Sequence, residues 1–351
     1  MPKTISASRS AWLVLGLAAA LGAAPWPAQA SDRDDRDDDE AFTFALWGDM
    51  PYLAADVTGP KVPALIADIN AARVAFSIFD GDIKSGSSLC TDDVYAAAVA
   101  RFNEFRAPMV YVAGDNEWTD CHRLNNGGFN ALSRLDYVRK TMFDTPFSFG
   151  HRKLFLHHQG PRGGLYSENT RFRHKGVAFL GLNVPGSNNN KVKAGECLSS
   201  KSARTQADCD ADNAEYEARD AANIQYLRET FALARSRGLR GVMVVIQADP
   251  SLDLPETETF DERTLPAFDG YNAFLAALLE ETKAFAGQVV LVHGDTHFFK
   301  VDKPLVNQAN LVPNFTRVET FGSPNIHWVK VTVDPRSRNL FTFEPMIVPG
   351  N

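Results

Sequence analysis

The chain has 351 residues, a formal net charge of −7 and a hydrophobic content of 44%. This length and apolar content fit one large α/β domain or two smaller ones, with enough apolar residues for a substantial core. The mildly acidic charge and the lack of a basic stripe argue against nucleic acid as the main partner.

The first 40 residues are predicted to lie outside the folded domain. Lys3 and Arg9 precede an apolar stretch at 11–24, and a small-x-small pattern ends at Ala30. This arrangement is typical of a secretory signal peptide over residues 1–30, cut after Ala30, whose apolar stretch is too short to span a bilayer. Residues 31–40 contain seven acids and two arginines, so we expect a disordered linker that either keeps the chain solvated or binds cations loosely. The mature protein is therefore expected to be secreted or periplasmic, without membrane association.

Four short apolar runs after residue 40 are predicted strands, and each is followed by a Gly-Asp pair. The runs cover residues 42–47, 74–79, 109–113 and 289–292, and the aspartates are Asp49, Asp82, Asp115 and Asp295. Such runs are typical of strands that are buried on both faces. Helical patterns at 62–73 and 92–105 separate the first three runs, which predicts a β-α-β-α-β order and a mostly parallel sheet. Because ligands bind at the carboxyl ends of such strands, these carboxylates indicate a metal site.

The later part of the chain supplies further predicted elements. We expect a long helix at 214–235 before a strand at 241–246, and a second helix at 268–285 before the run at 289–292. Segments 315–321 and 327–333 alternate as antiparallel strands. A polar insert at 187–210 is expected to form a rim over the site, because long loops in compact domains are often functional.

The protein contains four cysteines, which are potential disulfide partners if the chain is exported. Four cysteines allow three pairings, of which Cys90 with Cys121 and Cys197 with Cys209 is the favoured one. Cys90 and Cys121 follow the second and third Gly-Asp loops, so this bridge would hold one side of the site, while the second bridge would close the polar insert. A cysteine metal site is the weaker alternative, because no C-x-x-C spacing occurs.

The order of the motifs resembles the calcineurin-like metallophosphoesterase superfamily, which includes purple acid phosphatases and many exported phosphatases and nucleotidases. The family pattern runs D-x-H, G-D-x-x-D, G-N-H-D/E, a lone histidine after a strand, and G-H-x-H. The corresponding segments here are 48–52, 81–84, 114–117, 245–250 and 294–297. The resemblance covers roughly residues 42–335. It implies a divergent, exported member with one domain over 41–351, built as a four-layer α-β-β-α sandwich of two facing mixed sheets with the metal site at the strand carboxyl ends.

Three positions of the family's metal site are unchanged in this chain. Asp49 stands at the first-site carboxylate, Asp82 at the carboxylate that bridges two metals, and His297 at the second histidine of the last motif. The departures from the family are Pro51 for the first histidine, Asp115 for the asparagine ligand, Asn116 for the histidine that protonates the leaving group, Gln247 for the lone histidine and Asp295 for the first histidine of the last motif.

Most of these departures exchange an imidazole nitrogen for an amide or carboxylate oxygen. Oxygen ligands favour Mg²⁺, Mn²⁺ or Ca²⁺, with zinc or iron ions as alternatives. The resemblance implies two divalent ions. The expected ligands are Asp82, Asp115, Gln247 and Asp295 for one ion, and Asp49, Asp82 and His297, with Tyr52 or water, for the other. Otherwise Tyr52 would simply pack within its loop.

The resemblance implies an exported metal-dependent phosphoesterase that acts on a small phosphorylated substrate with a metal-activated hydroxide as nucleophile. Asn116 stands at the general-acid position but cannot supply a proton, which lowers the rate by about 10²–10⁴ where general acid catalysis is needed. Glu117, His293 and His122 are the available substitutes, so Asn116, Glu117 and His293 are the candidate catalytic residues. The alternative is a catalytically weakened or non-catalytic member of the same fold that binds a ligand or a cation. Crowded carboxylates oppose that alternative, because without cations they would repel one another.

Overall fold

The computed structural model describes residues 40–193, 195–252, 269–304 and 312–351. The predicted signal peptide and nearly all of the acidic linker lie outside these residues, as does Phe268 at the start of the second predicted helix. Within the described ranges, no helix combines the length and the apolar character that crossing a membrane would need.

The first sheet contains five strands. In spatial order they are β12 (Phe341–Met346), β11 (Trp328–Val333), β1 (Phe42–Trp47), β2 (Ser77–Phe79) and β3 (Met109–Tyr111). β1, β2 and β3 run parallel, whereas β11 is antiparallel to both of its neighbours. The predicted β-α-β-α-β segment is therefore confirmed.

The second sheet contains seven strands. In spatial order they are β4 (His157–His158), β5 (Thr170–His174), β6 (Val177–Gly181), β7 (Gly241–Val245), β8 (Gln288–His293), β10 (Phe315–Glu319) and β9 (Lys300–Asp302). β6, β7, β8 and β10 run parallel, and the outer strands are antiparallel to their neighbours. The two segments 315–321 and 327–333, predicted as antiparallel strands, do not pair with each other. β10 lies in the second sheet, parallel to β8 and antiparallel to β9, whereas β11 lies in the first sheet. Alternation of apolar residues reports which faces a strand presents and not its direction.

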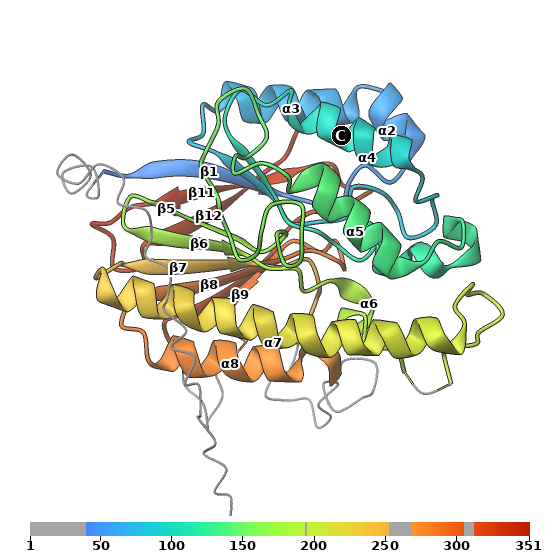
Figure 1. Ribbon diagram of the computed structural model, residues 1–351. Helices are drawn as coiled ribbons and strands as arrows, with labels where there is room; N and C mark the ends of the chain where they lie inside the picture. Colours follow the sequence, from blue (N-terminus) through green and yellow to red (C-terminus); the bar gives the residue numbers. More distant parts are fainter. Residues whose placement is uncertain (1–39, 194, 253–268, 305–311) are drawn as a thin grey trace, which may run out of the picture.

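Helices cover the outer face of each sheet (Figure 1). The first sheet is covered by α3 (Lys61–Ala71), α4 (Asp92–Phe102) and α5 (Ala131–Met142), and the second by α7 (Gln206–Ser236) and α8 (Asn272–Lys283). The shorter helical segments are α2 (Ala54–Thr58), η1 (Thr119–His122), η2 (Leu124–Asn126), α6 (Gly186–Asn189) and η4 (Asp269–Tyr271). Together with the two facing sheets, this confirms the predicted α-β-β-α sandwich.

The long helix α7 begins eight residues earlier than the sequence pattern predicts, at Gln206 instead of position 214. Thr205 caps it, because its hydroxyl accepts a hydrogen bond from the Asp208 amide at 3.2 Å. In return, Asp208 accepts one from the Thr205 amide at 2.8 Å. This capping box satisfies two amides that the first helical turn leaves unpaired. The apolar periodicity begins only later because the first residues of α7 belong to the polar insert, where Cys209 is bonded to Cys197.

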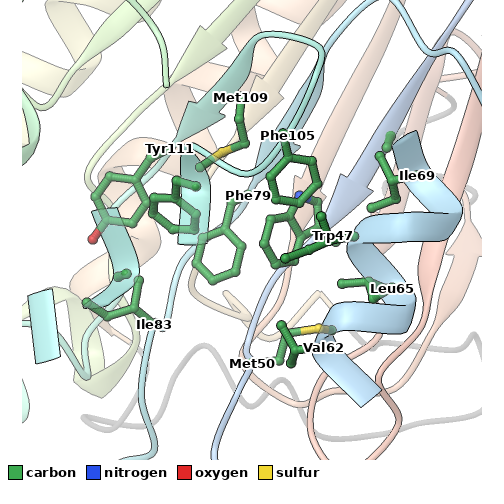
Figure 2. Close-up of a cluster of buried hydrophobic side chains, with 14 of the residues drawn as sticks. Trp47, Met50, Val62, Leu65, Ile69, Phe79, Ile83, Phe105, Met109 and Tyr111 are labelled. Carbon is green, nitrogen blue, oxygen red and sulfur yellow. The ribbon is translucent and has the colours of Figure 1, made fainter. Parts of the chain in front are cut away.

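β1 shows why its strand run is apolar at every position but Thr43. Phe44 and Leu46 pack in the core between the two sheets, whereas Ala45 and Trp47 pack in the core between the first sheet and its helices. Successive side chains of a strand point to opposite faces, so a strand buried on both faces is apolar at every position. Figure 2 shows Trp47 against the apolar face of α3.

Two disulfides tie the loops together. Cys90, after β2, is bonded to Cys121 in η1, and Cys197 is bonded to Cys209 at the start of α7. The predicted pairing is therefore confirmed. The first bridge connects the chain segments that follow two neighbouring strand ends of the first sheet.

Candidate metal centre

The carboxyl ends of the parallel strands bring the four Gly-Asp pairs together. Asp49 follows β1, Asp82 follows β2, Asp115 follows β3 and Asp295 follows β8 of the other sheet. The backbone turns sharply at three of these residues, with φ values of 51° at Asp49, 64° at Asp82 and 74° at Asp295. Aspartate is one of the few side chains that tolerate this left-handed region. The turns let carboxylates from both sheets face one another.

At three of the four pairs the glycine allows the close approach of an aspartate from another loop, and at Gly81 it makes room for the Gln247 side chain. A Cβ atom on Gly114 would lie 2.1 Å from Oδ1 of Asp82, and one on Gly294 would lie 1.8 Å from Oδ2 of Asp49. No side chain fits at such distances. The repeated Gly-Asp pair therefore has a physical reason, since its glycine makes room for a side chain of a neighbouring loop.

Three carboxylates form the centre of the cluster. Oxygens of Asp82, Asp115 and Asp295 lie within 4.8 Å of one another, and the first two residues are buried. Asp49 joins them through the backbone, because the Asp295 amide donates to Asp49 Oδ1 at 3.1 Å. The four predicted carboxylates thus form one group.

Tyr52 and His297 lie on the Asp49 side of this group. The Tyr52 hydroxyl is 2.8 Å from Asp82 Oδ2 and 3.3 Å from Asp49 Oδ1. Nε2 of His297 is 3.4 Å from the same Asp49 oxygen and 3.3 Å from the Tyr52 hydroxyl. The other ring nitrogen of His297 donates to the Ser323 carbonyl at 2.7 Å. This bond leaves Nε2 directed at the cluster, an arrangement usual for a metal-binding histidine.

Asn116 contacts Asp82 with two groups. Its backbone amide donates to Asp82 Oδ1 at 3.1 Å, and its side-chain amide donates to Asp82 Oδ2 at 2.5 Å. Asn116 therefore orients the central carboxylate of the cluster.

The amide oxygen of Gln247 faces away from the carboxylates. It accepts hydrogen bonds from the Gly186 amide at 2.6 Å and the Asp115 amide at 3.3 Å. The side-chain NH₂ donates to Asp295 Oδ1 at 3.2 Å. Both lone pairs of the oxygen are therefore used by backbone donors. In this arrangement Gln247 orients Asp295 and does not present the oxygen ligand that the sequence predicts.

Burial is the main electrostatic cost of the cluster. It raises the pKa of Asp49, and it raises the pKa values of Asp82 and Asp295 well above the usual range, with further contributions from neighbouring carboxylates such as Asp115. Burial alone would lower the pKa of His297, but the hydrogen bond and the charge of Asp49 outweigh it and raise that pKa. The group therefore holds more negative charge than its surroundings compensate.

The donor set fits divalent cations. Asp49 Oδ2 and Asp115 Oδ1 are buried, and neither receives a hydrogen bond from the described part of the chain. Buried carboxylate oxygens are normally hydrogen-bonded, or paired with a positive charge. Orphaned oxygens among crowded carboxylates, with an imidazole nitrogen directed at the same group, are typical of a metal centre.

The three substitute proton donors lie in different surroundings. Glu117 is buried beneath Asp82, where Oε1 accepts from the Ile83 amide at 3.1 Å and from the Tyr111 hydroxyl at 3.0 Å. His122 contacts the Ser202 hydroxyl at 2.8 Å, and burial lowers its pKa to about 3. It is therefore neutral at physiological pH. His293 does not face the four aspartates and belongs to a second group of side chains.

Two further residues contact the cluster without having been predicted. The Ser187 hydroxyl lies 2.9 Å from Asp115 Oδ2 and 2.7 Å from Asp120 Oδ1. Asp120 is buried, and burial together with the charge of Asp115 raises its pKa to about 7. A hydroxyl has one proton to donate, so a proton shared with Asp120 would satisfy both contacts.

Ser187 begins a run of left-handed backbone. Residues 187–190 have φ values of 51°, 57°, 58° and 62° in order. Left-handed residues normally occur singly, and asparagine is among the few side chains that adopt this conformation easily. The Asn-Asn-Asn sequence at 188–190 was the available signal for this segment. The left-handed backbone places the Ser187 side chain next to Asp115.

A cavity of about 880 Å³ opens beside the cluster. Asp120, Ser187 and Asp295 lie in its wall, and residues of the polar insert supply much of the opposite side. The basic residues that line it are Arg123, Lys191, Lys193, Lys201 and Arg204. Such a volume is within the usual range for a small-molecule site.

No family model matches the chain, and no curated protein matches it either. Among solved structures it is similar to PhoD, with 11% identity and a TM-score of 0.49 over 89% of this chain and 67% of that one. A purple acid phosphatase from yellow lupin seeds has 12% identity and a TM-score of 0.48 over 89% of this chain and 52% of its own. A 5'-nucleotidase from Candida albicans has 11% identity and a TM-score of 0.40 over 86% and 50%. The chain thus spans about half the length of the last two structures. At this level of similarity, the functional argument depends on the residues of the site.

Proposed function

We propose that the protein is an exported, metal-dependent hydrolase of phosphate esters. The observation that carries the proposal is the buried group of carboxylates with orphaned oxygens beside a cavity that basic residues line. Carboxylates that lack partners call for cations, and basic side chains near them favour an anionic substrate.

Asp49, Asp82, Asp115, Asp295 and His297 would hold two divalent ions. The mainly oxygen donor set favours Mg²⁺, Mn²⁺ or Ca²⁺. Bound ions of this kind activate water as a nucleophile and neutralise charge on phosphoryl oxygens. Gln247 would act through Asp295, whose orientation it fixes at 3.2 Å.

The protein's own residues would position the ligands and the substrate. Tyr52 and Asn116 hold the Asp82 carboxylate from two sides. Arg123 lines the cavity, pairs with Asp120, donates to the Ser187 hydroxyl at 3.2 Å and has a side chain that is 39% exposed. An accessible guanidinium is well suited to bind a phosphate oxygen. Asn116 has no proton to give to a leaving group, so aryl phosphates are expected to react faster than alkyl phosphates.

A non-catalytic cation binder is the second candidate. One observation favours it, since Asn116 and Tyr52 together donate to both oxygens of Asp82 and so satisfy this carboxylate without its bridging two ions. The two candidates differ in whether bound metal supports turnover.

The test measures metal content and turnover on the same samples. Protein stripped with a chelator is refilled with Mg²⁺, Mn²⁺, Ca²⁺ or Zn²⁺ and assayed with p-nitrophenyl phosphate and its bis ester. We expect metal-dependent turnover that Asp82→Asn abolishes. The control is Asp136→Asn, because Asp136 forms an exposed pair with Lys140 at 2.6 Å on α5. Metal binding without turnover on either ester would support the second candidate, and full activity of Asp82→Asn would overturn the site assignment.

A further inference from the structure

His293, Asp249 and Glu319 form a second group of metal-ligating side chains beside the four aspartates. Asp249 lies in the loop after β7, His293 ends β8 and Glu319 ends β10. β8 and β10 are parallel neighbours in which Glu319 pairs in register with His293. One ligand atom from each of the three residues lies within 4.8 Å of the others. This group is therefore another product of strand ends meeting at one edge of the sheet.

The segment 293–297 supplies side chains to both groups. Asp295 and His297 face the first centre, whereas His293 and Thr296 face the second group. The two are linked where the Asp249 amide donates to Asp295 Oδ2 at 3.3 Å. The second group thus has its own ligands, although it lies next to the first centre.

His293 provides the independent sign of a ligand. Its side chain is fully buried, with 0% exposure. Nδ1 lies 3.0 Å from the Gly294 carbonyl, which can only accept a hydrogen bond, so Nδ1 carries the proton. Nε2 is then the nitrogen with a free lone pair, and no donor among the described residues reaches it. Buried polar atoms normally have a hydrogen-bond partner, so an unpaired buried Nε2 indicates a ligand that is not part of the described chain.

Glu319 is oriented in a corresponding way. Its Oε1 accepts from the Thr296 hydroxyl at 2.6 Å and from the Phe298 amide at 2.7 Å. Its Oε2 is buried, and no hydrogen bond to it comes from residues that the structure describes. The nearest cation is Lys300, whose Nζ lies 3.4 Å away on a partly exposed side chain. Hydrogen bonds thus fix one oxygen of the carboxylate and leave the other for a ligand.

Asp249 completes the group from its half-buried loop. Its Oδ1 accepts from the Ser251 amide at 3.0 Å, and its Oδ2 lies 3.3 Å from the Thr296 hydroxyl. Outer hydrogen bonds of this kind hold metal ligands in place and are a regular part of metal sites. Thr296, which contacts both acids, is the outer residue that they share.

We propose that His293, Asp249 and Glu319 bind a first-row divalent transition metal ion, distinct from the ions of the first centre. One imidazole and two carboxylates suit Zn²⁺, Co²⁺ or Mn²⁺, whereas Mg²⁺ and Ca²⁺ sites are built from oxygen donors. The two carboxylates carry the charge that a divalent ion needs, and the partly exposed Lys300 would have to move away from Glu319 Oε2 when the ion binds. Three protein ligands leave coordination positions for water. The proposal does not depend on the phosphoesterase activity.

The test determines where Zn²⁺ binds and how much is bound. Anomalous scattering from crystals grown with Zn²⁺ should place an ion next to His293 Nε2, at the usual Zn–N distance of about 2.0–2.1 Å. Equilibrium dialysis should find one Zn²⁺ fewer per chain in His293→Gln than in the wild type. His327→Gln is the control, because this buried histidine lies in neither group and its ring accepts a hydrogen bond from the Val348 amide at 3.3 Å.

Asp249→Asn provides a second variant, because Asp249 lies on a half-buried loop and its replacement keeps the side-chain shape. Loss of an outer hydrogen-bond partner typically weakens metal binding 10–100-fold, so loss of this ligand should weaken it at least about tenfold. Asp82→Asn should remove zinc from the first centre and leave the ion at His293 in place. The proposal is overturned if His293→Gln and Asp249→Asn bind as much Zn²⁺ as the wild type, or if the anomalous signal lies only at the first centre. Neither result depends on turnover, so failure of the proposed function leaves this test unchanged.

Discussion

Arg219 on α7 holds the left-handed segment against the metal centre, and its replacement is the most direct test of that role. The side chain has 0% exposure. It donates to the Asn189 carbonyl at 2.8 Å, to the Asn189 side-chain oxygen at 2.6 Å and to the Asn183 carbonyl at 2.7 Å. It also forms an ion pair with Glu215 at 2.7 Å and lies over the Trp118 ring. One guanidinium thus connects the helix with both ends of the segment that carries Ser187.

Arg219→Met should lower the free energy of unfolding by about 3–5 kcal/mol, the usual cost of removing one partner of a buried ion pair. Each carbonyl left without a donor contributes to this loss. The matched control is Arg228→Met on the same helix, where Arg228 pairs with Glu280 at 3.0 Å and both side chains are more than half exposed, at 52% and 67%. Exposed pairs of this kind contribute about 0–1 kcal/mol. The two variants should therefore differ by at least about 2 kcal/mol.

Urea unfolding followed by circular dichroism measures this difference. Calorimetric titration with Mn²⁺ then measures the effect on the metal centre, because a displaced segment should also displace Ser187 from Asp115 and weaken binding. The reasoning is refuted if Arg219→Met unfolds within 1 kcal/mol of Arg228→Met, or if it binds Mn²⁺ as tightly as the wild type does.

Two other predictions concern pH and the disulfides. In metal-free protein, the raised pKa of Asp82 means that the folded state holds this proton more tightly than the unfolded chain does. The stabilisation that this bound proton gives the folded state is complete below about pH 4 and is lost as the pH rises. Asparagine does not titrate, so thermal unfolding in the presence of chelator should show Asp82→Asn gaining stability relative to the wild type from pH 4 to 7. A constant difference across that range would contradict this account. Replacing Cys90 and Cys121, which are 31 residues apart, with alanine should cost about 4 kcal/mol in urea unfolding and weaken Mn²⁺ binding. Replacing the other pair, which is 12 residues apart, should cost about 3 kcal/mol and spare Mn²⁺ binding. Equal Mn²⁺ affinities in the two double variants would argue against the first bridge as a support of the centre.

The positions of Asp49, Asp82, Asp115 and Asp295 could be predicted because both of their causes are local. A buried strand is a mainly apolar run, and at three of the four positions the preceding glycine allows an aspartate of another loop to approach closely. The Cys90–Cys121 pair follows from the same logic, since neighbouring strand ends bring the next loops together, whereas Cys197 and Cys209 are close in sequence and close the polar insert. Glu319 carries a similar signal as the acid that ends β10, but it is preceded by valine and belongs to an alternating strand.

Other parts of the site depend on contacts distant in sequence. Arg219 is one of many charged residues on a long helix, and nothing local distinguishes it from Arg228. Gln247 follows a strand as predicted, but the direction of its amide is set by the Gly186 and Asp115 backbone groups. Such orientations depend on how loops from different strands meet. The direction of β10 could not be predicted for a similar reason. Apolar alternation shows which residues of a strand are buried, but it does not show that β10 pairs parallel with β8.

The left-handed run at 187–190 also restricts which sequences can form this site. Ordinary L-residues lose about 1–2 kcal/mol each in this conformation, and β-branched residues fit it poorly. Substitution libraries should therefore retain mainly glycine, asparagine and aspartate at 188–190, whatever side chains the carboxylate positions accept. A Pro-Gly pair followed by a short polar segment, as at 185–190, is therefore a sequence motif by which distant homologues could be found even where their metal ligands have changed.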